Sequence, residues 1–360
     1  MPEVRLSGLE KRFGSVVAVT EVDLIVRDGE YVTILGPSGC GKTTLIKMIS
    51  GIWEPSKGTI TIDGKDMNGV PIEERDLGYV FQNIALFPHL NIFENVAYGP
   101  RVKVLGKEYI EEIPRRYLGM VNLLDRMGLF PSELAGGEQQ KVSLSRALAS
   151  GSKLLLLDEP LSALDARVRM DLRYELRRLA KDLNLTVIHV THDQEEAMSV
   201  SDRIVLMRNG RIVEISSPET MYKQPGTLFS ANFIGETNLL EGTVVGTGGT
   251  TTVRLRDGSN LTLNSSGFHH GGAVVVSVRP ENVYPADEGI PVRVSRTTFM
   301  GSYVRVLAKT EGNDDLEFDV PAKQNKCYRE GDELWLQVNG NMAILFIAPE
   351  EGVMEAIKLE

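Results

Sequence analysis

The sequence has few of the features that mark several large classes of protein. Its 360 residues include only two cysteines, Cys40 and Cys327, and neither belongs to a C-x-x-C pair. A structural zinc site or a disulfide framework is therefore not expected. The formal net charge is −10, so the chain lacks the basic footprint of a nucleic-acid-binding protein. We expect no nucleic-acid partner.

Long hydrophobic runs are also missing. No apolar stretch reaches the roughly 18 residues that a membrane-spanning helix needs. The N-terminal segment soon reaches Glu10-Lys11-Arg12 and lacks the apolar run of a signal peptide. These absences predict a cytoplasmic protein that reaches a membrane only through a partner.

The chain up to about residue 235 alternates short apolar runs with helical segments. Tyr31–Leu35, Leu154–Leu157 and Thr186–Val190 are continuous apolar runs, which suit strands buried on both faces of a parallel sheet. The segment from about 88 to 150 is predicted to be mostly helical, and Asp171–Lys181 to be an amphipathic helix. This alternation is typical of an α/β domain.

The pattern changes after about residue 236, where few helical segments intervene. Thr251–Leu255 and Asn260–Leu263 flank an Asp257-Gly258 hairpin signal. Further strand candidates are Val274–Val278, Val304–Ala308 and Glu333–Val338. We therefore predict a small all-β, barrel-like domain over residues 236–360.

The segment Gly36–Thr43 fits the pattern G-x-x-x-x-G-K-[ST] and follows the first apolar run. Its glycines allow backbone N–H groups to point inward at phosphates, and the following helix adds its positive dipole end. Lys42 can neutralise the β- and γ-phosphates, and the Thr43 hydroxyl can bind Mg²⁺. Cys40 has two interpretations: a small residue that the loop tolerates, or, because a helix N-terminus lowers the pKa of a thiol, an activated thiol whose alkylation would block nucleotide entry.

Polar residues end the two later apolar runs. Asp158 and Glu159 follow the first of them, where Asp158 can hold Mg²⁺ and Glu159 can activate the attacking water as a general base. His192 follows the second run and is expected at the same sheet edge, within reach of a γ-phosphate.

Together these motifs resemble those of the ATP-binding-cassette (ABC) ATPases. The resemblance covers residue 1 to about residue 235, and its elements occur in the order found in that family. The matching segments are Phe13 as the aromatic that stacks on adenine, Gly36–Thr43 as Walker A, Gln82 as the Q-loop glutamine, Leu134–Glu138 as the signature, Asp158-Glu159 as Walker B with the catalytic glutamate, Ser162-Ala163-Leu164-Asp165 as the D-loop, and His192 as the switch histidine.

The resemblance implies a P-loop NTPase fold over residues 1–235, with a RecA-like core and a helical subdomain at about 88–150. It implies ATP and Mg²⁺ as bound species. The catalytic residues would be Glu159, His192, Lys42 and Gln82, and the Mg²⁺ ligands would be Thr43, Gln82 and Asp158. The expected ATP contacts are Phe13, Gly36, Ser38, Gly39, Cys40, Gly41, Lys42, Thr43, Thr44, Ala135, Gly136, Gly137, Glu138 and Asp165.

In ABC ATPases the P-loop of one chain and the signature of a second chain sandwich the triphosphate. One cassette in this sequence therefore implies a homodimer or a pair with a related subunit. Ala85–Val96 is similar to the region that receives a permease helix in importers, with Phe87, Pro88 and Leu90 as apolar surface. The implied partners are permease subunits and, indirectly, an extracytoplasmic solute-binding protein.

The signature departs from the usual Leu-Ser-Gly-Gly-Gln, since Ala135 replaces Ser and Glu138 replaces Gln. Loss of the serine hydroxyl removes one charge-assisted hydrogen bond to the γ-phosphate, worth roughly 1.5–3 kcal/mol. Two interpretations remain open. The chain is either a weaker but working ATPase, or an ATP-binding subunit with weak or no hydrolysis.

The C-terminal part resembles the transport-associated OB-type (TOBE) domain of importer ATPases through Phe233–Asn238 and Ser277–Asn282. Such domains bind small regulators or help to hold the dimer together. This junction favours importers of polyamines, iron, oxyanions or phosphonates over maltose-type sugar importers. DNA-repair and translation ATPases of the superfamily usually have coiled-coil insertions or two cassettes, and exporters often have fused membrane spans, so import is the favoured function.

Overall fold

The computed structural model describes residues 2–103, 106–162, 164–323 and 328–359. The chain divides into two compact units, the first ending at Pro218 and the second covering Glu219–Lys358. The predicted boundary near residue 235 had placed two short helices, α7 (Pro218–Lys223) and α8 (Leu228–Phe233), in the first domain. They associate with the β unit because the buried Arg279 guanidinium donates to the carbonyls of Tyr222 and Ala231.

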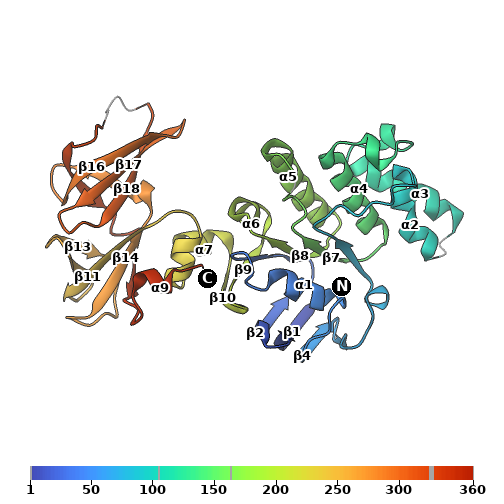
Figure 1. Ribbon diagram of the computed structural model, residues 1–360, viewed down its shortest axis with the longest axis horizontal. Helices are drawn as coiled ribbons and strands as arrows, with labels where there is room; N and C mark the ends of the chain where they lie inside the picture. The colour runs from blue at the N-terminus through green and yellow to red at the C-terminus, as the bar shows by residue number, and fades with distance from the viewer. Residues whose placement is uncertain (1, 104–105, 163, 324–327, 360) are drawn as a thin grey trace. The chain divides into compact units, whose positions relative to one another are not determined.

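A six-stranded sheet forms the centre of the first unit (Figure 1). The strands pair in parallel except at the edge, where β10 runs antiparallel to β9. In spatial order the strands are β10 (Arg211–Ser216), β9 (Arg203–Arg208), β3 (Tyr31–Leu35), β8 (Thr186–Thr191), β7 (Leu154–Asp158) and β6 (Leu77–Val80). All residues of β3, β7 and β8 are buried, which confirms the prediction from the continuous apolar runs.

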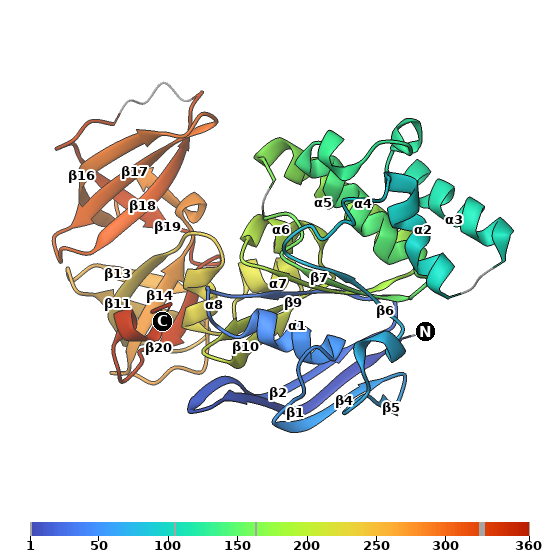
Figure 2. The same ribbon diagram turned by 45° about the vertical axis from the view of Figure 1, so that its right-hand side comes forward.

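One face of this sheet packs against helix α1 (Lys42–Ser50) and a second, antiparallel sheet (Figure 2). That sheet was not predicted. In spatial order its strands are β2 (Val16–Val26), β1 (Val4–Phe13), β4 (Lys57–Ile62) and β5 (Lys65–Asp66). Its side chains alternate between buried and exposed, and bulges interrupt the register of β1 with β2, so no continuous apolar run marks it in the sequence.

The other face of the central sheet is covered by helices, as predicted for the segment from about 88 to 150 (Figure 2). These are α2 (Ile92–Val102), α3 (Lys107–Met120), α4 (Gly136–Ala149) and α5 (Ala166–Asp182). Asn91 and Glu94 form a capping box that starts α2, with bonds of 2.8 and 3.1 Å. Asp165 caps α5 by accepting from the backbone N–H of Val168.

The C-terminal end of α1 is held by one buried arginine. The Arg75 guanidinium donates to the carbonyl oxygens of Met48 and Ile49 at 3.0 and 2.9 Å, and to those of Val70 and Met67 at 2.8 and 2.6 Å. It thereby satisfies carbonyls that the helix end leaves without intrahelical partners. This anchors the helix that begins at the P-loop.

The second unit is built from two five-stranded antiparallel sheets that share one hydrophobic core. In spatial order the first has β13 (Asn260–Leu263), β12 (Thr251–Leu255), β11 (Asn238–Gly246), β14 (Ala273–Val278) and β20 (Ile344–Ile347). The second has β15 (Val283–Ala286), β19 (Glu333–Val338), β16 (Ile290–Phe299), β17 (Tyr303–Thr310) and β18 (Asp315–Pro321). Asn238 joins the sheets through its side-chain amide, which donates a hydrogen bond to Glu317 O and accepts one from the Glu317 N–H. The all-β prediction is confirmed.

Among the described residues, no helix combines the length and the apolar character needed to cross a membrane.

Candidate functional site

The P-loop connects β3 to α1 and places two of its glycines, Gly36 and Gly41, where a side chain would clash. A Cβ at Gly41 would lie 2.5 Å from Ala18 O, and one at Gly36 would lie 2.3 Å from Met207 O. Gly41 also has φ of 105°, a conformation that other residues rarely adopt. Ser38 and Gly39 are exposed on the loop, and Thr44 is half-buried in α1. Glycine at Gly36 and Gly41 thus lets the loop pack closely against the backbone at Met207 and Ala18.

Lys42 is buried with its ammonium group folded onto this loop. Its Nζ donates to Gly36 O at 2.8 Å and to Pro37 O at 2.7 Å. No carboxylate of the described residues lies within ion-pair distance of Lys42. Nζ also lies 3.8 Å from Cys40 Sγ. A buried cation that is held by carbonyl dipoles and a weak sulfur contact attracts an anion strongly, as phosphate binding requires.

The expectation that Cys40 is an activated thiol is wrong. The side chain is only 3% exposed, and burial raises the pKa of the thiol, although the nearby Lys42 charge acts in the opposite direction. The desolvation of a thiolate therefore outweighs the attraction of the Lys42 charge and its hydrogen bonds here. Cys327, the other cysteine, lies outside the described residues.

Asp158 lies at the end of β7, next to the start of α1. Its Oδ1 is 3.4 Å from Thr43 Oγ1, and its Oδ2 accepts from Tyr79 OH at 3.2 Å. Burial raises the pKa of Asp158, and the Tyr79 hydrogen bond offsets this only in part. A cation beside this carboxylate would stabilise its charged form. The carboxylate and hydroxyl oxygens are the hard ligands that Mg²⁺ prefers.

Tyr79 was not predicted as part of the site. It lies in β6, three residues before Gln82, and both burial and Asp158 raise the pKa of its hydroxyl, which therefore stays a hydrogen-bond donor. The only available signal was its place in the strand that leads to the Q-loop. No cluster of three or more His, Cys, Asp or Glu side chains suited to a metal occurs in the described ranges.

Glu159 is held in an unusual backbone conformation, with φ of 46°. Its N–H donates to Val190 O at 2.9 Å, and the Ser162 hydroxyl donates to its carbonyl at 3.0 Å. A left-handed conformation costs a residue such as Glu roughly 1–2 kcal/mol, and such costs persist where the surroundings enforce them. The strain directs the Glu159 side chain away from that of its neighbour Asp158.

Two predicted residues converge on the Glu159 carboxylate. Gln82 Nε2 lies 3.1 Å and His192 Nδ1 lies 3.2 Å from the same oxygen, Oε2. These residues follow β6 and β8, and all the strands concerned end at one edge of the sheet. The convergence of Lys42, Asp158, Glu159, Gln82 and His192 at this edge is the geometry that the sequence predicted.

The signature segment is a separate site within the chain. Ala135 is the N-cap of α4, and its N–H donates to Glu138 Oε2 at 3.1 Å. Glu138 also pairs with Arg126 at 3.1 Å. A Cβ at Gly137 would lie 2.5 Å from Val168 Cγ1, so only glycine fits there.

A hollow of about 390 Å³ lies beside the signature and includes Gly136, Asp165 and Lys141 in its lining. No hydrogen bond or ion pair between described residues joins this segment to the P-loop. Ala163 of the expected D-loop lies outside the described residues.

Phe13 lies at the end of β1 and is 42% exposed. Its ring packs edge-on against Trp53 at 5.0 Å, and Lys11 Nζ lies 5.1 Å from its centroid. An exposed ring face is available for stacking, and the role in adenine binding stays a prediction.

Comparison with known proteins shows to which family the chain belongs. The ABC transporter family profile matches residues 19–162, and the TOBE domain profile matches residues 276–346. The chain is 42% identical to the spermidine/putrescine import ATP-binding protein PotA of Rubrobacter xylanophilus, over 85% of this chain and 83% of that protein. The chain belongs to the importer-type ABC ATPases that carry a C-terminal TOBE domain.

Two further relatives fit this family. The sulfate/thiosulfate import ATP-binding protein CysA of Ralstonia nicotianae is 39% identical over 92% of both chains. A solved ATP-binding cassette, dimeric and bound to ADP and phosphate in a post-hydrolysis state, is 30% identical. It covers 60% of this chain and 98% of its own, with a TM-score of 0.54. The resemblance noted in the sequence is therefore confirmed.

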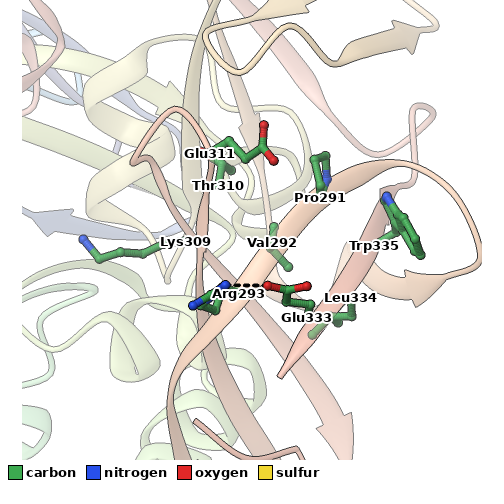
Figure 3. A pocket seen from close by; sticks show the side chains of 9 residues that line it. All are labelled: Pro291, Val292, Arg293, Lys309, Thr310, Glu311, Glu333, Leu334 and Trp335. Atoms are coloured by element: carbon green, nitrogen blue, oxygen red, sulfur yellow. Dashed lines mark hydrogen bonds and ion pairs between the residues drawn. The ribbon is translucent and has the colours of Figure 1, made fainter. Parts of the chain in front are cut away.

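The C-terminal unit of this ABC ATPase carries a hollow of about 660 Å³ on one sheet (Figure 3). Pro291 and Arg293 of β16 and Glu333 and Trp335 of β19 contribute to it, and Arg293 pairs with Glu333. Its full lining is Pro291, Val292, Arg293, Lys309, Thr310, Glu311, Glu333, Leu334 and Trp335. The two cationic and two anionic side chains balance, so charge alone does not select a ligand, and a regulatory role stays a prediction.

Because Ala135 is the N-cap of α4, a substitution at this position tests whether the altered signature lowers ATP turnover. Ala135→Ser should stabilise the start of α4 by about 1 kcal/mol, because serine is a good N-cap and alanine is not. It should also raise ATP turnover several-fold by adding a donor for the γ-phosphate. Steady-state ATPase rates and thermal unfolding would measure both effects. Ala135→Gly, which adds no hydroxyl, is the control, and an unchanged rate in the serine variant would contradict the expectation.

Proposed function

We propose that this chain hydrolyses ATP to energise an importer of the polyamines spermidine and putrescine. The observation that carries the hydrolytic part is the placement of Glu159, whose Oε2 is held by both Gln82 and His192. A carboxylate that only ended a strand would need neither contact. We infer hydrolysis rather than ATP binding alone, because the groups that act on water are assembled within one chain.

In this proposal the P-loop backbone and Lys42 hold the β- and γ-phosphates. Thr43, Asp158 and Gln82 would hold Mg²⁺, which would neutralise charge on the phosphate oxygens. Gln82 and His192 contact only Oε2 of Glu159, which leaves Oε1 to accept a proton from the attacking water. The adjacent acids therefore have different tasks, since Asp158 is buried beside the P-loop helix and Glu159 is directed elsewhere.

The signature would act on ATP bound to a second copy of the chain. Its N–H groups lie at the start of a helix, where the dipole favours an anion. The dimeric state of the similar solved cassette supports a homodimer here. Phe13, Ser38, Thr44 and Asp165 would complete the composite ATP site.

Permease contact is proposed at the segment after the Q-loop. The Phe87 ring packs at 4.6 Å on Tyr98, which is 45% exposed, and the Arg146 guanidinium lies 5.2 Å from the Phe87 centroid. This aromatic surface suits the apolar face of a short permease helix. We therefore propose a cytoplasmic location at the inner face of the cell membrane, with a solute-binding protein as an indirect partner.

The catalytic assignment is tested by Glu159→Gln. This change should lower kcat at least about 100-fold, because the general base is lost while the shape of the side chain is kept. ATP affinity, measured by equilibrium binding of a fluorescent analogue, should be retained. Glu73→Gln, on an exposed turn, is the matched control. Full turnover in Glu159→Gln would show that another group activates the water.

The solute is tested by uptake in a strain that lacks the gene. Uptake of labelled spermidine should be lost and should return with the wild-type gene but not with Glu159→Gln. Sulfate uptake should be unchanged, since the proposal rests on the similarity to polyamine import subunits. Loss of sulfate uptake with normal spermidine uptake would favour the oxyanion class of the CysA relative.

A further inference from the structure

A second histidine lies three residues before the switch histidine and has no part in the proposed mechanism. His189 occupies the middle of β8 and is fully buried. Its neighbours in the register are Thr33 of β3 and Leu157 of β7, so it lies inside the central sheet. A polar ring in an otherwise apolar strand is costly unless its nitrogens have partners.

Each ring nitrogen of His189 lies close to one polar group, although the contact of Nε2 is an ion-pair approach without hydrogen-bond geometry. Nδ1 lies 3.1 Å from Tyr31 OH, and Nε2 lies 3.3 Å from Glu196 Oε1. Glu196 belongs to α6 (Gln194–Val200) and is itself only 2% exposed. Burial alone would raise the pKa of Glu196, but His189 and the Thr191 hydroxyl outweigh it, and the net shift is downward. A charged carboxylate is therefore held against the imidazole.

The other oxygen of Glu196 reaches the switch loop. Thr191 Oγ1 donates to Glu196 Oε2 at 2.5 Å, and the same hydroxyl accepts from the backbone N–H of Asp193 at 3.1 Å. Thr191 and Asp193 are the two chain neighbours of His192. The sequence of contacts from His189 through Glu196 thus fixes the backbone on both sides of the switch histidine.

The loop is held from its other side by helix α5. Arg169 and Arg173 each lie 3.0 Å from Asp193 Oδ2. Arg169 also donates to Leu164 O at 2.9 Å, in the D-loop segment. With Asp193 fixed to α5, the bond between Glu196 and Thr191 decides how the short turn that carries His192 is oriented.

We propose that His189 and Glu196 form a positioning pair that orients His192 toward Glu159 for ATP hydrolysis. The pair touches neither substrate nor the reacting atoms, and it acts through Thr191. This inference rests on the proposed role of His192 and Glu159. It predicts an effect on the chemical step and little effect on ATP binding, since the P-loop makes no contact with the pair among the described residues.

The test compares substitutions in the full-length chain. His189→Phe keeps the ring volume but removes both nitrogens, and it should lower kcat about tenfold, because small misplacements of catalytic groups are costly. KM for ATP should stay within about twofold, since binding energy is unchanged. His189→Gln, whose amide can still donate to Glu196, should restore most of the activity.

Two further variants separate positioning from general stability. Thr191→Val removes the hydroxyl that links Glu196 to the switch loop, so it should lower kcat as His189→Phe does, and it serves if the latter does not fold. Thr33→Val is the matched control, because it removes a buried 2.5 Å bond to Ser201 at the other end of α6. It should lower the melting temperature without lowering kcat.

Unchanged kcat in both His189→Phe and Thr191→Val would overturn the positioning role, as would an equal loss of kcat in Thr33→Val. These outcomes are distinct from failure of the proposed function. That failure would appear as a wild-type chain without ATPase activity or as full activity in Glu159→Gln.

Discussion

The buried ammonium of Lys42 is the constraint on which the site depends. Its Nζ donates to the carbonyl oxygens of Gly36 and Pro37 and lies 3.8 Å from Cys40 Sγ, and a positive charge in such a place is costly without an anion. The glycines around it admit no other side chain at Gly36 and Gly41 without a clash. A triphosphate supplies the negative charge that the Lys42 ammonium lacks. The loop therefore favours the same ligand on which the catalytic residues act.

The central sheet brings the catalytic residues to the same place as the phosphate-binding loop. Because β3, β7 and β8 are parallel neighbours, the P-loop, Asp158 and His192 leave the sheet at one edge. The adjacent carboxylates of Asp158 and Glu159 then lie in different surroundings. Asp158 stays beside Thr43 and Tyr79, whereas the left-handed backbone at Glu159 directs its side chain toward Gln82 and His192. This is how neighbouring acids acquire different chemical tasks.

Sequence patterns predicted the parts of the fold that a local signal marks, such as a continuous apolar run or a turn dipeptide. Fully buried strands such as Leu154–Asp158 are continuous apolar runs, and the hairpin of β12 and β13 follows from Asp257-Gly258. The antiparallel sheet of β1, β2 and β4 was missed, because bulges and half-exposed faces blur its alternation. Helices α7 and α8 were assigned to the first domain, since contacts such as those of Arg279 arise only in the folded chain.

The site was predicted where a motif encodes it and missed where tertiary contacts create it. Gln82, Glu159 and His192 were found through their motifs, and the structure brings them together. Tyr79 and His189 lie within strands, and their contacts with Asp158 and Tyr31 form only in the folded chain. The activated-thiol interpretation of Cys40 failed because burial, which the sequence does not show, raises the pKa of the thiol despite the nearby Lys42 charge.

The central claim is that the Lys42 charge binds and activates the triphosphate, and ATP binding and turnover of a Lys42→Ala variant test it most directly. We expect ATP affinity to fall at least about tenfold, as for the loss of a buried charge-assisted contact, and turnover to be abolished in a protein that remains folded. A folded variant with wild-type ATP affinity and turnover would contradict the claim.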